Sequence, residues 1–173
     1  MNSDTAPTAA PLFVDALDRF VARLANLLAV LAGICLVFAM AVAAANMVLR
    51  ATSVSIQSTV ELVGFSGAVL TAFSLAFTQR HKGHIAVGIL FQRFGAGTRR
   101  VLNFITMLAS AGFFLACAVE VGRWGVSLIQ TGELAETMRI PYHPLVFAVA
   151  FGCLVLALAL VADGLKALYG KGD

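Results

Sequence analysis

Four long apolar stretches dominate the chain, and shorter segments between them carry nearly all of its charged residues. The stretches cover residues 24–49, 60–78, 101–129 and 145–166. A helix rises about 1.5 Å per residue, so roughly 20 residues cross the hydrocarbon core of a bilayer. The pattern therefore predicts four transmembrane helices.

Residues 1–23 precede the first apolar stretch and begin with a polar tail. Between residues 12 and 24 apolar side chains recur at steps of three and four, which predicts an amphipathic helix on the membrane surface. The charged residues interspersed there are Asp15, Asp18, Arg19 and Arg23. The first apolar stretch exceeds the core of a secretory signal peptide, and acidic residues precede it, so we expect an uncleaved helix.

A second surface helix is predicted between spans two and three. Residues 85–94 are mostly apolar and are flanked by basic residues, which favours a helix in the membrane interface. The expected fold is therefore all-α and integral to the membrane: four transmembrane helices, an N-terminal amphipathic helix and an interfacial helix. Residues 24–168 form one membrane domain, followed by a short tail at 169–173.

The overall composition agrees with a membrane protein. Of the 173 residues, 60% are apolar and only 12% are charged, too few to cover a soluble domain of this length. The net charge is +3, but the basic residues are spread over short connections and form no face with interleaved aromatic side chains. This distribution excludes nucleic-acid binding.

The positions of lysine and arginine predict the orientation. Nine of the 12 lie with the two termini and the connection between spans two and three, and the other three lie on the opposite side. Because cytoplasmic segments carry an excess of lysine and arginine, both termini are expected in the cytoplasm.

The sequence offers no catalytic or cofactor site. The three cysteines lie in apolar stretches without metal-ligand spacing, and the three histidines lie in connections, where they cannot hold a haem between helices. No nucleophilic triad or phosphate-binding glycine loop is present, so we expect no enzyme activity and no cofactor in this chain. The spans also lack a central acidic residue, which leaves no obvious proton site, although serine, threonine and backbone carbonyl groups can still form a sodium site.

The charged residues at the ends of the spans are candidates for partner contacts. On the predicted outer side they are Arg50, Glu61, Glu120, Arg123, Glu133, Glu136 and Arg139. One interpretation is internal pairing, of Glu120 with Arg123 on one helix face and of Arg50 with Glu61 across a short turn. The other is a charged rim that meets a soluble partner.

The basic connection after span two contains Arg80 and His84. Its basic residues fit the cytoplasmic topology and contact with anionic lipid headgroups. A second interpretation, compatible with the first, is that His84 and the apolar segment after it dock onto a larger membrane subunit.

Several short segments together form a familiar pattern. They are Asn46 to Arg50, Val60-Glu61-Leu62, Arg80 to Val87, Gly132-Glu133 and Ile140 to Pro144. The pattern resembles the small, Q-type membrane subunit of tripartite ATP-independent periplasmic (TRAP) transporters, over roughly residues 46–152. The most specific part is the basic stretch that ends in His84. Val60 departs from the pattern, since this position is often acidic or small and polar in the family.

The resemblance implies an accessory role. In that family a large membrane subunit carries substrate and sodium, and a periplasmic binding protein delivers organic anions such as dicarboxylates, keto acids or sialic acid. The small subunit enlarges the static scaffold and helps to present a docking surface. The implied partners are the large subunit, the binding protein and membrane lipids, with sodium coupling in the large subunit.

Three alternatives remain open from the sequence. The small subunit of a tripartite tricarboxylate transporter has a similar architecture. A membrane anchor of a redox enzyme would bind haem or quinone, and a self-contained exporter would transport without partners. The transported substrate is not specified by this chain, because the selecting residues would lie in other subunits.

Overall fold

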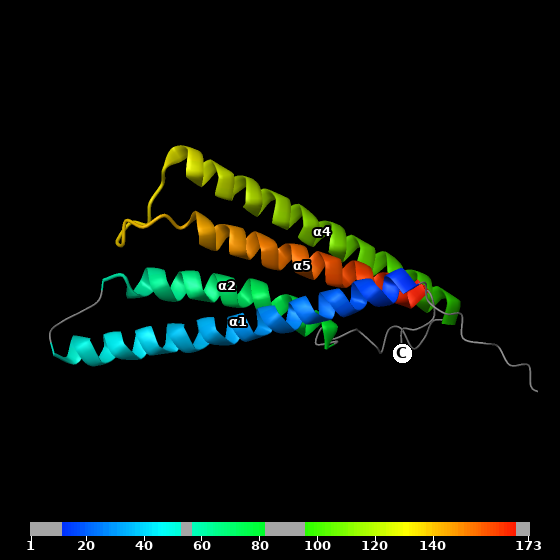
Figure 1. Cartoon of the computed structure of the whole chain (residues 1–173), viewed down its shortest axis with the longest axis horizontal. Helices are drawn as coiled ribbons and strands as arrows, with labels where there is room; N and C mark the ends of the chain where they lie inside the picture. The colour runs from blue at the N-terminus through cyan, green and yellow to red at the C-terminus, as the bar shows by residue number, and fades with distance from the viewer. Residues whose placement is uncertain (1–11, 53–56, 82–95, 169–173) are drawn as a thin grey trace, which may run out of the picture.

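The computed structural model describes residues 12–52, 57–81 and 96–168. These residues form four helices, α1 (Leu12–Ala51), α2 (Thr59–Arg80), α4 (Ala96–Thr131) and α5 (His143–Leu168) (Figure 1). Each contains a stretch long and apolar enough to cross a membrane: Ala16–Ala51, Thr59–Arg80, Phe104–Thr131 and His143–Leu165. The prediction of four helices long and apolar enough to span a membrane is therefore confirmed.

The helices lie side by side in the order α4, α5, α2, α1 (Figure 1). Helix α5 packs against α4 on one side and α2 on the other, and α1 packs mainly on α2. Helix α1 also crosses toward α5 near its own beginning (Figure 1). We call the end where α2 begins the Glu61 end, and the end where α2 finishes the Arg80 end.

The predicted amphipathic segment before span one is helical but is not a separate element. Helix α1 runs without interruption through 40 residues, about 60 Å at the usual rise per residue. Within this segment Val21 is fully buried, whereas Phe20, one of the residues of the predicted apolar face, is 61% exposed. One side of the segment therefore packs inside the protein, and Phe20 lies on its outer surface. The interfacial helix predicted at 85–94 lies outside the described residues.

The shared core is built largely from small side chains. Ala25 and Leu28 of α1, Ala72 and Ala76 of α2, and Leu156 of α5 belong to one buried cluster. Small side chains let helices approach closely, which favours packing in a membrane where the hydrophobic effect between helices is weak.

The closest approach joins α2 to α5. A Cβ atom added at Gly152 would lie 2.8 Å from the carbonyl oxygen of Ala72, so only glycine fits at this crossing. A second close contact lies between α4 and α5, where a Cβ atom at Gly125 would lie 3.1 Å from the ring of Phe147.

The second half of α1 is left largely uncovered. Its buried residues end at Ala32, and side chains such as Val37 and Met47 are more than two-thirds exposed. In α5, by contrast, half of the most apolar window is buried inside the protein. The row of helices thus presents extensive apolar surface at its flanks, as expected for a protein surrounded by lipid or by another membrane protein.

Candidate functional site

The polar contacts between different elements lie at the two ends of the helices. Residues 24–49, 62–79, 101–119 and 145–162 contain no Asp, Glu, Lys or Arg. The charged side chains that bridge different helices or connections lie at the Arg80 end and at the Glu61 end. Each end forms a distinct polar cluster.

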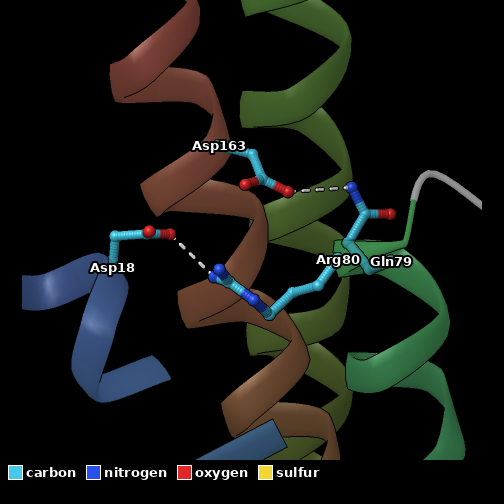
Figure 2. Close-up of polar contacts among 4 residues, drawn as sticks. All are labelled: Asp18, Gln79, Arg80 and Asp163. Atoms are coloured by element: carbon cyan, nitrogen blue, oxygen red, sulfur yellow. Dashed lines mark hydrogen bonds and ion pairs between the residues drawn. The ribbon is translucent and has the colours of Figure 1, made fainter. Parts of the chain in front are cut away.

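At the Arg80 end, polar contacts join three helices (Figure 2). The Nη1 atom of Arg80 in α2 lies 2.7 Å from Oδ1 of Asp18 in α1, and these side chains are only 18% and 17% exposed. The Nε2 atom of Gln79, a buried residue, donates to Oδ2 of Asp163 in α5 at 3.4 Å. Two neighbouring residues of α2 thus fasten α1 and α5 to it.

The Arg80 cluster stabilises the fold from within. A short hydrogen bond between charged groups, as between Arg80 and Asp18, contributes about 1.5–3 kcal/mol, and a partly buried ion left without its partner is costly. The Gln79 contact, at 3.4 Å, is weaker. The sequence had suggested Arg80 as a partner contact, but its guanidinium binds Asp18 of the same chain. Asp18, Gln79 and Asp163 were not predicted as a set. Their positions could have indicated the cluster, because all three residues lie near the helix ends on the side of the connection after α2.

At the Glu61 end, one carboxylate holds the connection between α4 and α5. Glu61 lies in the first turn of α2. Its Oε1 accepts a hydrogen bond from the backbone N–H of Thr137 at 2.7 Å, and its Oε2 accepts one from Met138 at 3.2 Å. Both oxygens are therefore used on two successive donors of the connection.

Glu61 could instead have capped its own helix. Ser58 and Glu61 have the spacing of a capping box, in which the glutamate reaches back to the N–H of the capping residue. In the structure Ser58 precedes α2 without a side-chain capping hydrogen bond, and Glu61 reaches away to the α4–α5 connection. A long-range contact replaces a local one.

The α4–α5 connection is itself tightly folded. Gly132 ends α4 with a φ of 67°, and its N–H donates to the carbonyl oxygen of Leu128 at 3.1 Å. The N–H of Ala135 donates to Ile140 O at 3.0 Å, and the N–H of Arg139 donates to Ala135 O at 2.9 Å. Arg139 has a φ of 52°, a left-handed conformation that costs energy for a residue with a side chain.

Aromatic side chains of α2 and α4 pack against the same connection. The ring of Tyr142 stacks on Phe65 of α2 at a centroid distance of 5.8 Å and lies 6.2 Å from Trp124 of α4. The hydroxyl of Tyr142 donates to Oε2 of Glu133 at 3.1 Å. The pKa of Tyr142 lies above its ordinary value. The largest cause is desolvation, and the hydrogen bond to Glu133 and the negative charge of Glu133 also raise it.

The two predicted ion pairs have different outcomes. Glu120 and Arg123 do pair, at 2.7 Å with both side chains about 70% exposed, so this prediction is confirmed. The pairing of Arg50 with Glu61 is wrong, because the Glu61 oxygens bind backbone N–H groups. Arg50 lies exposed in the last turn of α1. The sequence could not predict the contact of Glu61 with Thr137 and Met138, because nearly every residue has a backbone N–H donor.

Three other predicted residues lie together on the surface of the connection. Glu133, Glu136 and Arg139 are all exposed within the segment that Glu61 holds. His84 lies outside the described residues. Within the described ranges no group of three or more His, Cys, Asp or Glu side chains is placed to hold a metal ion. The arrangement can fasten helices together and present a charged, ordered surface at one end.

Comparison with known proteins places these features in a family. Residues 39–169, about three quarters of the chain, match the family described as tripartite ATP-independent periplasmic transporters, DctQ component. No curated protein and no solved structure matches the chain. The matched region contains all of α2, α4 and α5, together with the Glu61 contact to the α4–α5 connection. The chain therefore belongs to the DctQ family, the small component of TRAP transporters.

Proposed function

We propose that this chain is a fixed accessory subunit of a TRAP transporter in a bacterial inner membrane, with both termini in the cytoplasm. It enlarges the scaffold of a large membrane subunit and helps to dock a periplasmic substrate-binding protein. The complex takes up organic anions coupled to sodium, and the sodium and substrate sites lie in the large subunit. The observation that carries the proposal is the family match over residues 39–169.

The arrangement of polar groups supports a static role. The side chains that fasten separate elements to one another, Arg80, Gln79 and Glu61, lie at the helix ends. A proton-coupled carrier commonly keeps an ionisable group near the middle of the membrane, and the four spans have no charged residue there. The exposed second half of α1 offers apolar surface for a larger membrane partner.

Co-purification and transport test the proposal. The chain is co-expressed with the large membrane subunit and the binding protein encoded by adjoining genes, and a tag on the chain is used for purification. We expect the large subunit to co-purify, and uptake of a labelled dicarboxylate, keto acid or sialic acid to require all three proteins and a sodium gradient. Uptake by vesicles that contain only this chain would contradict the proposal.

Charge reversal tests the docking role separately. Arg50→Glu and Glu136→Lys alter exposed residues at the Glu61 end. We expect weaker uptake while the membrane complex still co-purifies, because the changes affect the surface that meets the binding protein. Normal uptake by both variants would remove these residues from the docking surface. Arg23→Glu reverses an exposed charge of α1 at the Arg80 end, away from the proposed docking surface, and serves as the control.

A further inference from the structure

The contact between Glu61 and the α4–α5 connection links segments far apart in the sequence. Its two hydrogen bonds join residues separated by 76 and 77 positions, from Oε1 to Thr137 N and from Oε2 to Met138 N. Because the two donors are successive, the carboxylate restrains both the position and the direction of the backbone there. A contact at a single donor would leave the connection free to rotate.

The segment restrained in this way has a conformation that needs support. Arg139 directly follows Met138 and adopts a φ of 52°. Such a conformation persists in a residue with a Cβ atom only where its surroundings hold it. The backbone bonds between Ala135 and Ile140 close the turn, and Glu61 attaches the turn to α2.

The surface of the α4–α5 connection that Glu61 holds is polar and carries charges of both signs. Glu136 and Arg139 lie at the tip and Glu133 lies beside it, all of them exposed. Carboxylates disfavour contact with anionic lipid headgroups, whereas neighbouring charges of both signs suit a protein surface of complementary charge. An ordered surface also loses less conformational entropy when a partner binds.

We infer that Glu61 is a positioning residue for docking: by binding the backbone of Thr137 and Met138, it holds the tip of the α4–α5 connection in the shape that the periplasmic binding protein contacts. This inference rests on the proposed function and deepens it. Glu61 itself does not touch the partner. Its effect on uptake passes through the conformation of residues 136–139.

The experiment uses the complete membrane complex in proteoliposomes, with Glu61→Gln as the main variant. Glutamine keeps one acceptor oxygen but replaces the other with an NH₂ group, which cannot accept from a backbone N–H. We measure uptake against the concentration of the binding protein. The half-saturating concentration is expected to rise about fivefold, with the maximal rate unchanged, because weakened docking is overcome at high binding-protein concentration. Limited trypsin cleavage after Arg139 is expected to become faster.

Two further variants make the result specific. Glu120→Gln removes the same charge from an exposed site on α4 that bonds to Arg123, so it should leave the half-saturating concentration and the cleavage unchanged. Glu61→Asp retains both acceptor oxygens on a shorter side chain and should fall between wild type and Glu61→Gln. This second variant tests the inference even if Glu61→Gln fails to assemble.

Several outcomes would overturn the inference. Unchanged cleavage after Arg139 would mean that Glu61 does not hold the connection. Faster cleavage with an unchanged half-saturating concentration would mean that the binding protein does not contact it. A rise in the half-saturating concentration seen only in vesicles with anionic lipid would mean that the connection contacts lipid headgroups and not the binding protein. In all three cases the chain would still co-purify and be required for uptake, whereas a chain dispensable for uptake would refute the proposed function itself.

Discussion

Replacing Gly152 by alanine tests the contact between α2 and α5 directly. The added Cβ atom would lie 2.8 Å from the carbonyl oxygen of Ala72 and 2.9 Å from its carbonyl carbon and Cβ. Non-bonded carbon atoms prefer a separation of about 3.5–4.0 Å. The two helices would therefore have to part by roughly 0.6–1 Å, and the obstructing atoms include backbone that cannot rotate away.

The expected loss of stability follows from two opposing terms. Forcing extra atoms into a close-packed contact costs about 1–3 kcal/mol. Alanine recovers up to about 1 kcal/mol relative to glycine in a helix interior. We therefore expect Gly152→Ala to lower the free energy of unfolding by about 1–2 kcal/mol.

The assay is equilibrium unfolding of the purified chain in detergent, followed by circular dichroism and by the fluorescence of its single tryptophan, Trp124. Gly64→Ala is the matched control, because Gly64 also lies in a span and a Cβ atom there meets nothing within 4 Å. The control should unfold at the wild-type midpoint or above. Equal stability of Gly152→Ala and Gly64→Ala would refute the close approach of α2 and α5.

Three further predictions concern polar contacts. Replacing Asp18 by asparagine or Arg80 by glutamine should each cost about 1.5–3 kcal/mol, and a double-mutant cycle should show strong coupling, because the pair is more than four-fifths buried. Arg123→Gln should change the free energy of unfolding by no more than about 0.5 kcal/mol, since water screens its exposed pair. The pKa of Tyr142 should lie above its ordinary value, so its hydroxyl stays protonated and bonded to Glu133 until the pH rises through that higher pKa. Absorbance of tyrosinate measures the pKa, and Glu133→Gln should lower it.

Most of the fold was predictable from local composition. The predicted spans at 60–78 and 145–166 lie within two residues of α2 and within two of α5. The main difference is at the beginning of the chain, where α1 runs from Leu12 without interruption. Periodicity alone does not show which side of this segment contacts another helix: Val21 is buried inside the protein, and Phe20 of the predicted apolar face is exposed.

The candidate site was predictable only in part. The pairing of Glu120 with Arg123 follows from their spacing on one helix, and the structure confirms it. The partners of Glu61 and Arg80 depend on which helix ends come together in space. Opposite charges near each other in the sequence, such as Arg50 and Glu61, suggested a pair that the structure does not contain.

The number of helices able to span a membrane followed from composition, because transfer into a bilayer depends on the apolar content of each segment taken alone. The tertiary structure decided the order of the helices, the glycine contact at Gly152 and the use of Glu61 to hold a distant connection. These features depend on close packing and on backbone N–H donors. Every residue except proline has such a donor, so no sequence pattern identifies the ones that a carboxylate will bind.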